Sequence, residues 1–167
     1  DVLNLINASK TGTEENVVIG PSMGGLITRY ALNYMENQTI DHDTRLWISF
    51  DSPHLGANVP IGFQHLFNYL AYGLDTWVGD FSVDALKPVV DGMLKSPAAR
   101  QMLVDHFEAR LASGSITDFD PTKLLPQKHP YNITFYDSMN SLTTSGYPDN
   151  LRRVSLINGS GVGEIFD

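Results

Sequence analysis

The chain contains no cysteine, a low share of basic residues and no long apolar run. Without cysteine it can form no disulfide, thiolate metal site or cysteine nucleophile, although this absence does not fix the compartment. Lysine and arginine number 11 against 19 acidic residues, which gives a formal net charge of −8. Such a charge argues against nucleic acid as a partner and against binding to anionic lipid headgroups through bulk charge.

Apolar segments are too short for a membrane span. No stretch approaches the roughly 18 uninterrupted apolar residues of a transmembrane helix, and no charged and then apolar segment opens the chain as a signal peptide would. With 167 residues, 42% hydrophobic and 18% charged, the chain has an ordinary globular composition and enough length for one core. We therefore expect residues 1–167 to form one domain.

One short motif indicates a nucleophilic serine. The sequence Gly20-Pro21-Ser22-Met23-Gly24-Gly25 contains G-x-S-x-G, and the apolar, β-branched run 16–19 before it predicts a buried parallel strand. Apolar residues then recur at helical spacing and predict an amphipathic helix: Leu26, Ile27, Tyr30, Ala31, Tyr34 and Met35. Strand, turn and helix in this order are the context that a nucleophile elbow requires.

The residue types suit attack on a carbonyl. Ser22 would occupy a sharp, strained turn, and flanking glycines remove Cβ atoms that would collide with neighbouring backbone. The new helix points free N–H groups at a developing oxyanion. Two alternatives remain, a structural turn and a phosphate-binding glycine turn, although the chain lacks both G-x-G-x-x-G and a Lys-Ser/Thr pair after the glycines.

The rest of the chain predicts an α/β protein. Residues 45–50 form a second apolar run, so the helix between the two runs makes a β-α-β unit with adjacent parallel strands. Residues 151–157 predict a third strand. Helices are expected over 1–10 and 131–142, and also over 61–111, where no strand is expected. Three apolar stripes support that helical block: Phe63, Leu66, Phe67, Leu70 and Ala71; Val83, Leu86, Val90 and Leu94; and Met102, Leu103, Phe107 and Leu111 after the Ser96-Pro97 start signal.

Two segments together resemble the lipases and esterases of the α/β-hydrolase superfamily. They are the elbow motif and Asp51-Ser52-Pro53-His54-Leu55-Gly56-Ala57 after the second strand, where many of these enzymes carry Pro-His-x-Gly. The chain is also similar to a group of bacterial hydrolases related to inositol-deacylase-like lipases. The resemblance implies a parallel sheet with flanking helices and a helical insertion or lid over 61–115, a plain helical layer being the alternative. It also implies that Ser22 is the nucleophile and that the Met23 backbone N–H is an oxyanion donor.

The superfamily pattern is only partly present. Its histidine follows a later strand, but the tail after residue 157 contains Glu164 and Asp167 and no histidine, and only fifteen residues precede the first strand. The resemblance therefore implies a partial α/β-hydrolase fold from inside a larger enzyme. The run 16–19 has the profile of a central strand, so we expect the piece to associate through that open sheet edge and to show little esterase turnover by itself.

Other polar residues receive lesser roles. His54 and Asp51 lie in the loop after the second strand, where the resemblance implies that His54 shapes the loop and does not act as the base. For the other histidines, His42, His65, His106 and His129, surface or core positions are expected. A metal-dependent hydrolase using Asp41, His42 and Asp43 is a weak alternative because their spacing suits no standard zinc motif.

A serine carboxylester hydrolase is the leading functional hypothesis. It would act on a small-molecule or lipid-like ester and would need no cofactor and no metal. Acyl transfer or amide cleavage would use the same nucleophile, and a binding or scaffold module that lacks a working triad remains open.

Overall fold

The computed structural model describes residues 2–76, 79–124 and 126–159, so Glu164 and Asp167 lie outside the described residues. The described residues form two compact units. Unit 1 comprises the described residues within 1–54 and 138–167, and unit 2 comprises those within 55–137. Within the described residues, no helix is long and apolar enough to cross a membrane.

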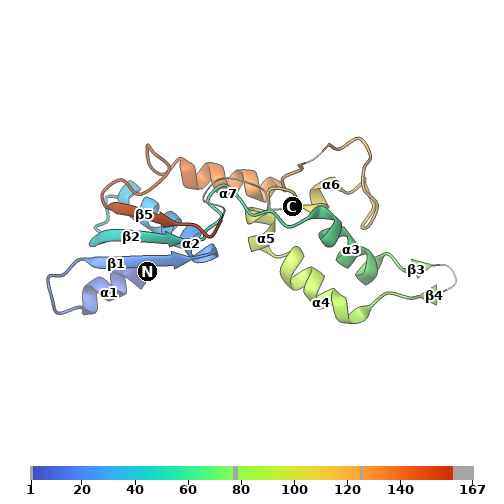
Figure 1. Ribbon diagram of the computed structural model, residues 1–167, viewed down its shortest axis with the longest axis horizontal. Helices are drawn as coiled ribbons and strands as arrows, with labels where there is room; N and C mark the ends of the chain where they lie inside the picture. The colour runs from blue at the N-terminus through green and yellow to red at the C-terminus, as the bar shows by residue number, and fades with distance from the viewer. Residues whose placement is uncertain (1, 77–78, 125, 160–167) are drawn as a thin grey trace. The chain divides into compact units, whose positions relative to one another are not determined.

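Unit 1 contains a three-stranded parallel sheet in the order β1-β2-β5. Its strands are β1 (Asn16–Pro21), β2 (Thr44–Phe50) and β5 (Arg152–Leu156). The helix α2 (Met23–Asn37) connects β1 to β2, and α1 (Val2–Ser9) precedes β1 (Figure 1). The predicted strands, their parallel pairing and the intervening helix are confirmed. The fold is thus α/β and is consistent with a partial α/β-hydrolase-like fold.

The helix α2 covers one face of the sheet. Apolar side chains on its inner face are buried with Trp47 of β2, whose indole N–H donates to Thr28 Oγ1 at 2.9 Å. The buried apolar residues of unit 1 include Leu26, Leu32, Met35, Trp47, Met139 and Pro148. This core explains why residues 16–35 and 44–50 fold into one β-α-β unit.

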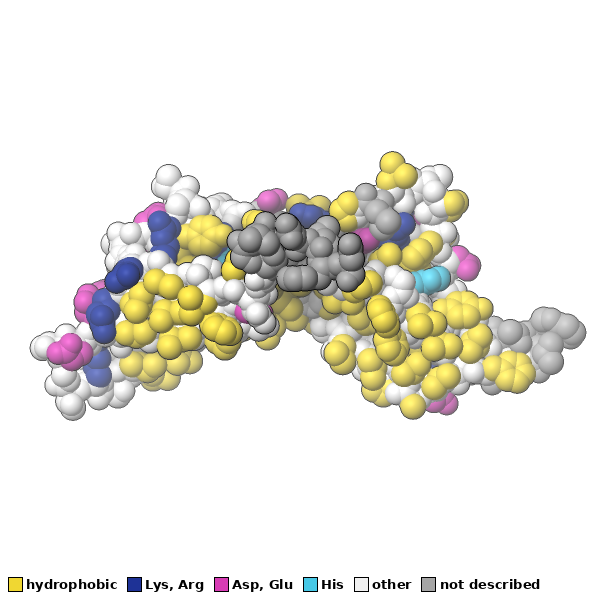
Figure 2. All heavy atoms as spheres, in the orientation of Figure 1, with side chains coloured by type: hydrophobic (Ala, Val, Ile, Leu, Met, Phe, Trp, Pro, Cys, Tyr) yellow, Lys and Arg dark blue, Asp and Glu magenta, His cyan; other side chains and the backbone are white. Residues whose placement is uncertain are grey.

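The other face of the sheet is apolar but exposed within the described residues. Residues 16–19 have the profile of a central strand, but within the described residues β1 pairs only with β2, and its Val17 and Ile19 are 42% and 60% exposed. Phe50 and Leu156 follow the same face and are also about half exposed. Figure 2 shows hydrophobic side chains gathered over the strands of the sheet. Within the described residues, the free side of β1 is thus the open sheet edge that the sequence analysis expects, and the apolar face of the three strands has no cover.

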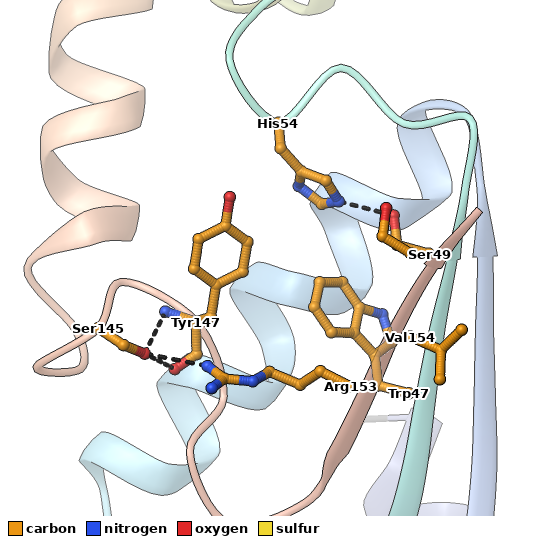
Figure 3. Close-up of a pocket in the computed structure, with 8 residues that line it drawn as sticks. Trp47, Ser49, His54, Ser145, Tyr147, Arg153 and Val154 are labelled. Atoms are coloured by element: carbon orange, nitrogen blue, oxygen red, sulfur yellow. Dashed lines mark hydrogen bonds between the residues drawn. The ribbon is translucent and has the colours of Figure 1, made fainter. Parts of the chain in front are cut away.

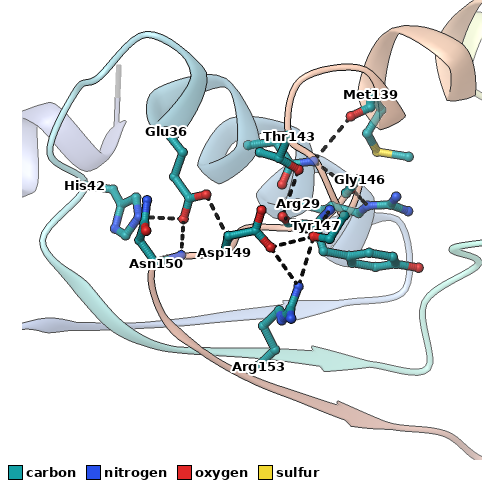
Figure 4. Close-up of polar contacts among 12 residues, drawn as sticks. Arg29, Glu36, His42, Met139, Thr143, Gly146, Tyr147, Asp149, Asn150 and Arg153 are labelled. Atoms are coloured by element: carbon teal, nitrogen blue, oxygen red, sulfur yellow. Dashed lines mark hydrogen bonds and ion pairs between the residues drawn. The ribbon is translucent and has the colours of Figure 1, made fainter.

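A polar network fixes the loop that leads into β5 (Figure 4). Glu36, at the end of α2, accepts hydrogen bonds from the backbone N–H groups of Asp149 and Asn150 at 2.7 and 2.9 Å. His42 Nε2 lies 3.3 Å from the same carboxylate. The carboxylate therefore holds the end of the helix, the start of β2 and the start of β5 together.

Unit 2 is mainly helical. It contains α3 (Ile61–Tyr72), α4 (Lys87–Val89), α5 (Pro97–Met102) and α6 (Phe107–Arg110), and α7 (Pro130–Asn140) begins in it and ends in unit 1. A 3₁₀ turn over Asp84–Leu86 precedes α4, and a π-helical turn over Val90–Leu94 follows it. The expected start of a helix at Ser96 is confirmed, because its Oγ accepts from Ala99 N–H at 3.1 Å.

Two expectations for unit 2 are wrong. The block is not free of strands, because β3 (Asp75–Thr76) and β4 (Gly79–Asp80) form a short antiparallel pair. The helix expected from Pro97 to Leu111 is broken, because Leu103 leaves helical geometry and pairs with Ala57 as an isolated bridge.

The helix α3 buries its polar side. Gln64 and Asn68 are buried, whereas Phe63 and Leu66 of the predicted core stripe are 57% and 50% exposed. Gln64 Nε2 donates to the carbonyls of Val59 and Asp105 at 2.8 and 2.9 Å, and Asn68 Nδ2 donates to that of Ile116 at 2.7 Å. Buried loop carbonyls need hydrogen-bond donors, and here that need decides which side of α3 is buried, in place of the apolar stripe.

Candidate functional site

Ser22 lies on the turn between β1 and α2, as the sequence predicts. It has φ 50° and ψ −127°, a sparsely populated combination for a residue with a side chain. Its backbone N–H donates to Phe50 O at 2.8 Å, which ties the turn to the end of β2. The side chain is exposed and does not cap α2. The backbone is thus held in a strained geometry that leaves the hydroxyl accessible.

At two positions of the motif, only glycine fits, because a Cβ atom would collide with neighbouring atoms. A Cβ atom at Gly20 would lie 2.5 Å from Gly24 O and from Thr28 Oγ1, and one at Gly25 would collide with Ser52 Oγ. Gly24 is less restricted, since the nearest atom to its Cβ would be Pro21 Cδ at 3.3 Å. Gly20 and Gly25 therefore allow the close approach of β1, α2 and the loop after β2.

The start of α2 provides hydrogen-bond donors beside Ser22. Met23 is the first residue of this fifteen-residue helix, so its N–H has no acceptor within the helix. The positive end of the helix dipole lies at the same position. A negative oxygen that developed close to Ser22 would be stabilised there.

Asp51 is the direct neighbour of Ser22 across the sheet. The two residues follow Pro21 and Phe50, which are paired in the parallel register. Asp51 also has a positive φ, 47°, and its N–H donates to Leu156 O at 2.7 Å. Its carboxylate accepts from Asn158 N–H at 3.4 Å. Two strained non-glycine residues thus stand side by side at the carboxyl ends of adjacent strands.

His54 is bound to Ser49, five residues earlier in the chain. Its Nε2 lies 2.6 Å from Ser49 Oγ, and its ring packs edge-on against Trp47 and Tyr147. Burial, and secondarily the positive charge of Arg29, lowers the pKa of His54 to about 4. The ring is therefore neutral near pH 7, and within the described residues its hydrogen bond goes to Ser49 and not to Ser22.

The other histidines bind backbone or a single carboxylate. His65 Nε2 and His106 Nε2 contact the carbonyls of Thr117 and Leu94, and His129 Nδ1 accepts from Tyr131 N–H. His42 faces Glu36 and accepts from Thr44 N–H through Nδ1. These contacts agree with the structural roles expected from the sequence.

The weak alternative of a metal site is wrong for the residues described. His42 is engaged by Glu36, Asp43 by Lys10, and Asp41 Oδ1 by the Asp43 N–H at 2.8 Å. In the described ranges, no three histidine, aspartate or glutamate side chains form a group that could hold a metal ion.

Sequence reasoning missed the polar residues around His54. Ser49 is a hydroxyl among the apolar residues 46–50 of β2, on the same face as Trp47, which is where a partner for a histidine in the following loop would lie. Tyr147 lies in a Gly-Tyr-Pro turn that predicts only a change of direction. No local pattern brings it to His54, since more than ninety residues separate them.

The sheet and its helices define an α/β protein with a strained serine after the first described strand. Residues 1–88 match the family model described as "Putative serine esterase (DUF676)". Because 88 of the 167 residues are matched, the chain belongs to this family. No curated protein and no solved structure matches the chain significantly.

Proposed function

We propose that the protein is a serine carboxylester hydrolase with Ser22 as its nucleophile. The single observation that best supports this proposal is the conformation of Ser22, with φ 50° and ψ −127° between a parallel strand and a helix N-terminus. A strained residue persists where its surroundings impose it, and such residues concentrate at functional sites. The family match adds support, because its description names serine esterases.

The proposed reaction proceeds through an acyl-enzyme. Ser22 Oγ adds to the ester carbonyl, its proton passes to a base, and the carbonyl oxygen becomes an oxyanion that the Met23 N–H stabilises. Collapse expels the alcohol, which takes up the proton, and leaves an acyl group on Ser22. Water then adds to that ester and releases the carboxylic acid. The substrate class that we propose is a lipid-like or aryl ester.

The proposal does not assign the base. Within the described residues, His54 is hydrogen-bonded to Ser49. This observation favours a second candidate, a binding module that retains the turn without turnover. The two candidates differ in the reactivity of Ser22, because a hydroxyl without a base is a poor nucleophile near neutral pH.

Labelling by a fluorophosphonate probe tests the proposal. The expected result is a single covalent adduct that mass spectrometry maps to the peptide containing Ser22. Ser22→Ala should abolish the adduct, whereas Ser9→Ala, at an exposed serine of α1, should not change it. Absence of labelling in a folded protein would favour the binding module, and labelling of another serine would refute the assignment of Ser22.

A further inference from the structure

Unit 1 has a pocket of about 500 Å³ beside β2 and β5 (Figure 3). Three aromatic rings form its walls: Trp47, His54 and Tyr147. Their centroids lie 5.6 to 6.4 Å apart in tilted or edge-on arrangements. Ser145, Arg153 and Ser155 provide polar groups. An apolar body with a few convergent polar groups is the usual composition of a small-molecule site.

Arg29 packs against the Tyr147 ring of the aromatic wall. The Arg29 guanidinium carbon lies 3.7 Å from the centroid of the Tyr147 ring. Arg29 is itself buried, and it donates to Gly146 O at 2.8 Å and to Asn140 Oδ1 at 2.7 Å. The Tyr147 ring is thus in contact with the Arg29 cation and with the His54 ring. A wall fixed in this way would lose little entropy when a flat ligand binds.

A cation lines the pocket, and one carboxylate, that of Asp149, lies close to it. Arg153 is one of its lining residues, and no aspartate or glutamate is among them. The guanidinium Nη1 makes only long contacts, 3.2 Å to Ser145 Oγ and 3.4 Å to Asp149 Oδ1, and the side chain is 44% exposed. Within the described residues, its other nitrogens have no hydrogen-bond partner. Arginine of this kind suits a planar carboxylate, which it can bind through two parallel N–H groups.

We propose that this pocket binds a small aromatic carboxylate, with its ring against Tyr147 and His54 and its carboxylate on Arg153. The ring would pack on the apolar walls, and the anion would compete with the long contact to Asp149. The proposal goes beyond the ester hydrolase and does not depend on it, because none of the groups invoked is Ser22 or Met23. Loss of Ser22 should leave the binding unchanged.

Fluorescence of Trp47 gives a direct test. In a Trp77→Phe background Trp47 is the only tryptophan, and benzoate should change its emission in a saturable way. Benzamide has the same shape without the charge and should bind about ten-fold more weakly, the ratio that one charge-assisted contact supplies. Arg153→Gln should remove the preference for benzoate. Arg152→Gln is the matched control, because Arg152 is the preceding residue of β5 and its side chain leaves the opposite face of the sheet.

A second measurement needs no variant. Because the ring of the ligand would pack against His54, saturating benzoate should move the imidazole resonances of His54 in an NMR spectrum. No saturable response to benzoate would overturn the proposal. Equal affinity for benzoate and benzamide, equal effects of the two arginine substitutions, or unmoved His54 resonances at saturation would each also overturn it.

Discussion

Ser22 N–H donates to Phe50 O at 2.8 Å, so the turn after β1 is anchored to the last residue of β2. Asp51, which follows Phe50, repeats the arrangement by donating its N–H to Leu156 O of β5 at 2.7 Å. Each strand end thus fixes the first residue beyond its neighbour, and both fixed residues have a positive φ. The sheet itself therefore imposes the strained geometry at Ser22.

The strain at Ser22 should be visible in stability. Ser22→Gly should raise the free energy of unfolding by about 1 kcal/mol relative to Ser22→Ala, because glycine tolerates a positive φ and alanine does not. The exposed hydroxyl makes no capping bond that either change would remove. Urea unfolding of the two variants measures the difference. A Ser22→Ala protein as stable as Ser22→Gly would show that the turn is not strained.

The two adjacent glycines of α2 should respond differently to alanine. Gly25→Ala should destabilise the protein by about 1–3 kcal/mol, because the added methyl group collides with Ser52. Gly24→Ala should change stability by less than about 1 kcal/mol, since its Cβ would meet only Pro21 Cδ at 3.3 Å and alanine favours the helix.

A double variant checks the steric cause. Ser52→Gly should recover part of the stability lost in Gly25→Ala, and the two changes should be non-additive in thermal or urea unfolding. Additive effects would place the cause elsewhere than in the contact between residues 25 and 52.

The lowered pKa of His54 predicts a dependence of stability on pH. An unfolded histidine takes up a proton near pH 6.5, whereas His54 in the folded protein does so only near pH 4. The unfolded chain therefore binds more protons between these values, and stability is lost as the pH falls from 6.5 towards 4. The contribution should not exceed about 2 kcal/mol, because the half-exposed ring is partly screened by solvent.

Comparison with His54→Gln isolates this contribution. His106 and His129 also have lowered pKa values, so the native protein should lose stability with acid for more than one reason. The difference between the two proteins, measured by urea unfolding at pH 7 and pH 5, should shrink at the lower pH. A constant difference would mean that His54 titrates normally in the folded protein.

Local patterns predicted unit 1 well because its elements are defined by short-range signals. The runs around Ile19 and Ile48 and the periodic helix between them are sufficient to specify a β-α-β unit. In α3 the same reasoning failed. Gln64 bonds two carbonyls that belong to residues 5 and 41 positions away, and no periodicity of apolar residues contains that information.

In the candidate site, too, only the features that depend on neighbouring residues in the sequence could be predicted. The position and backbone strain of Ser22 follow from Gly20, Gly25 and the strand before them, which are neighbours in sequence. The position of Asp51 beside Ser22 depends on the register between β1 and β2. The hydrogen bond between His54 and Ser49 depends on the face of β2 along which the following loop runs. Those relationships arise only when the sheet is assembled.

The most direct test of the central claim is the trapping of an acyl-enzyme. The protein is mixed with p-nitrophenyl butyrate and quenched in acid, and its peptides are analysed by tandem mass spectrometry. The account predicts one butyryl group on Ser22, absent from Ser22→Ala and present in Ser9→Ala, because an activated ester can acylate the serine even where turnover is small. No butyryl group, or one that persists on another residue in Ser22→Ala, would contradict the assignment of Ser22 as the nucleophile.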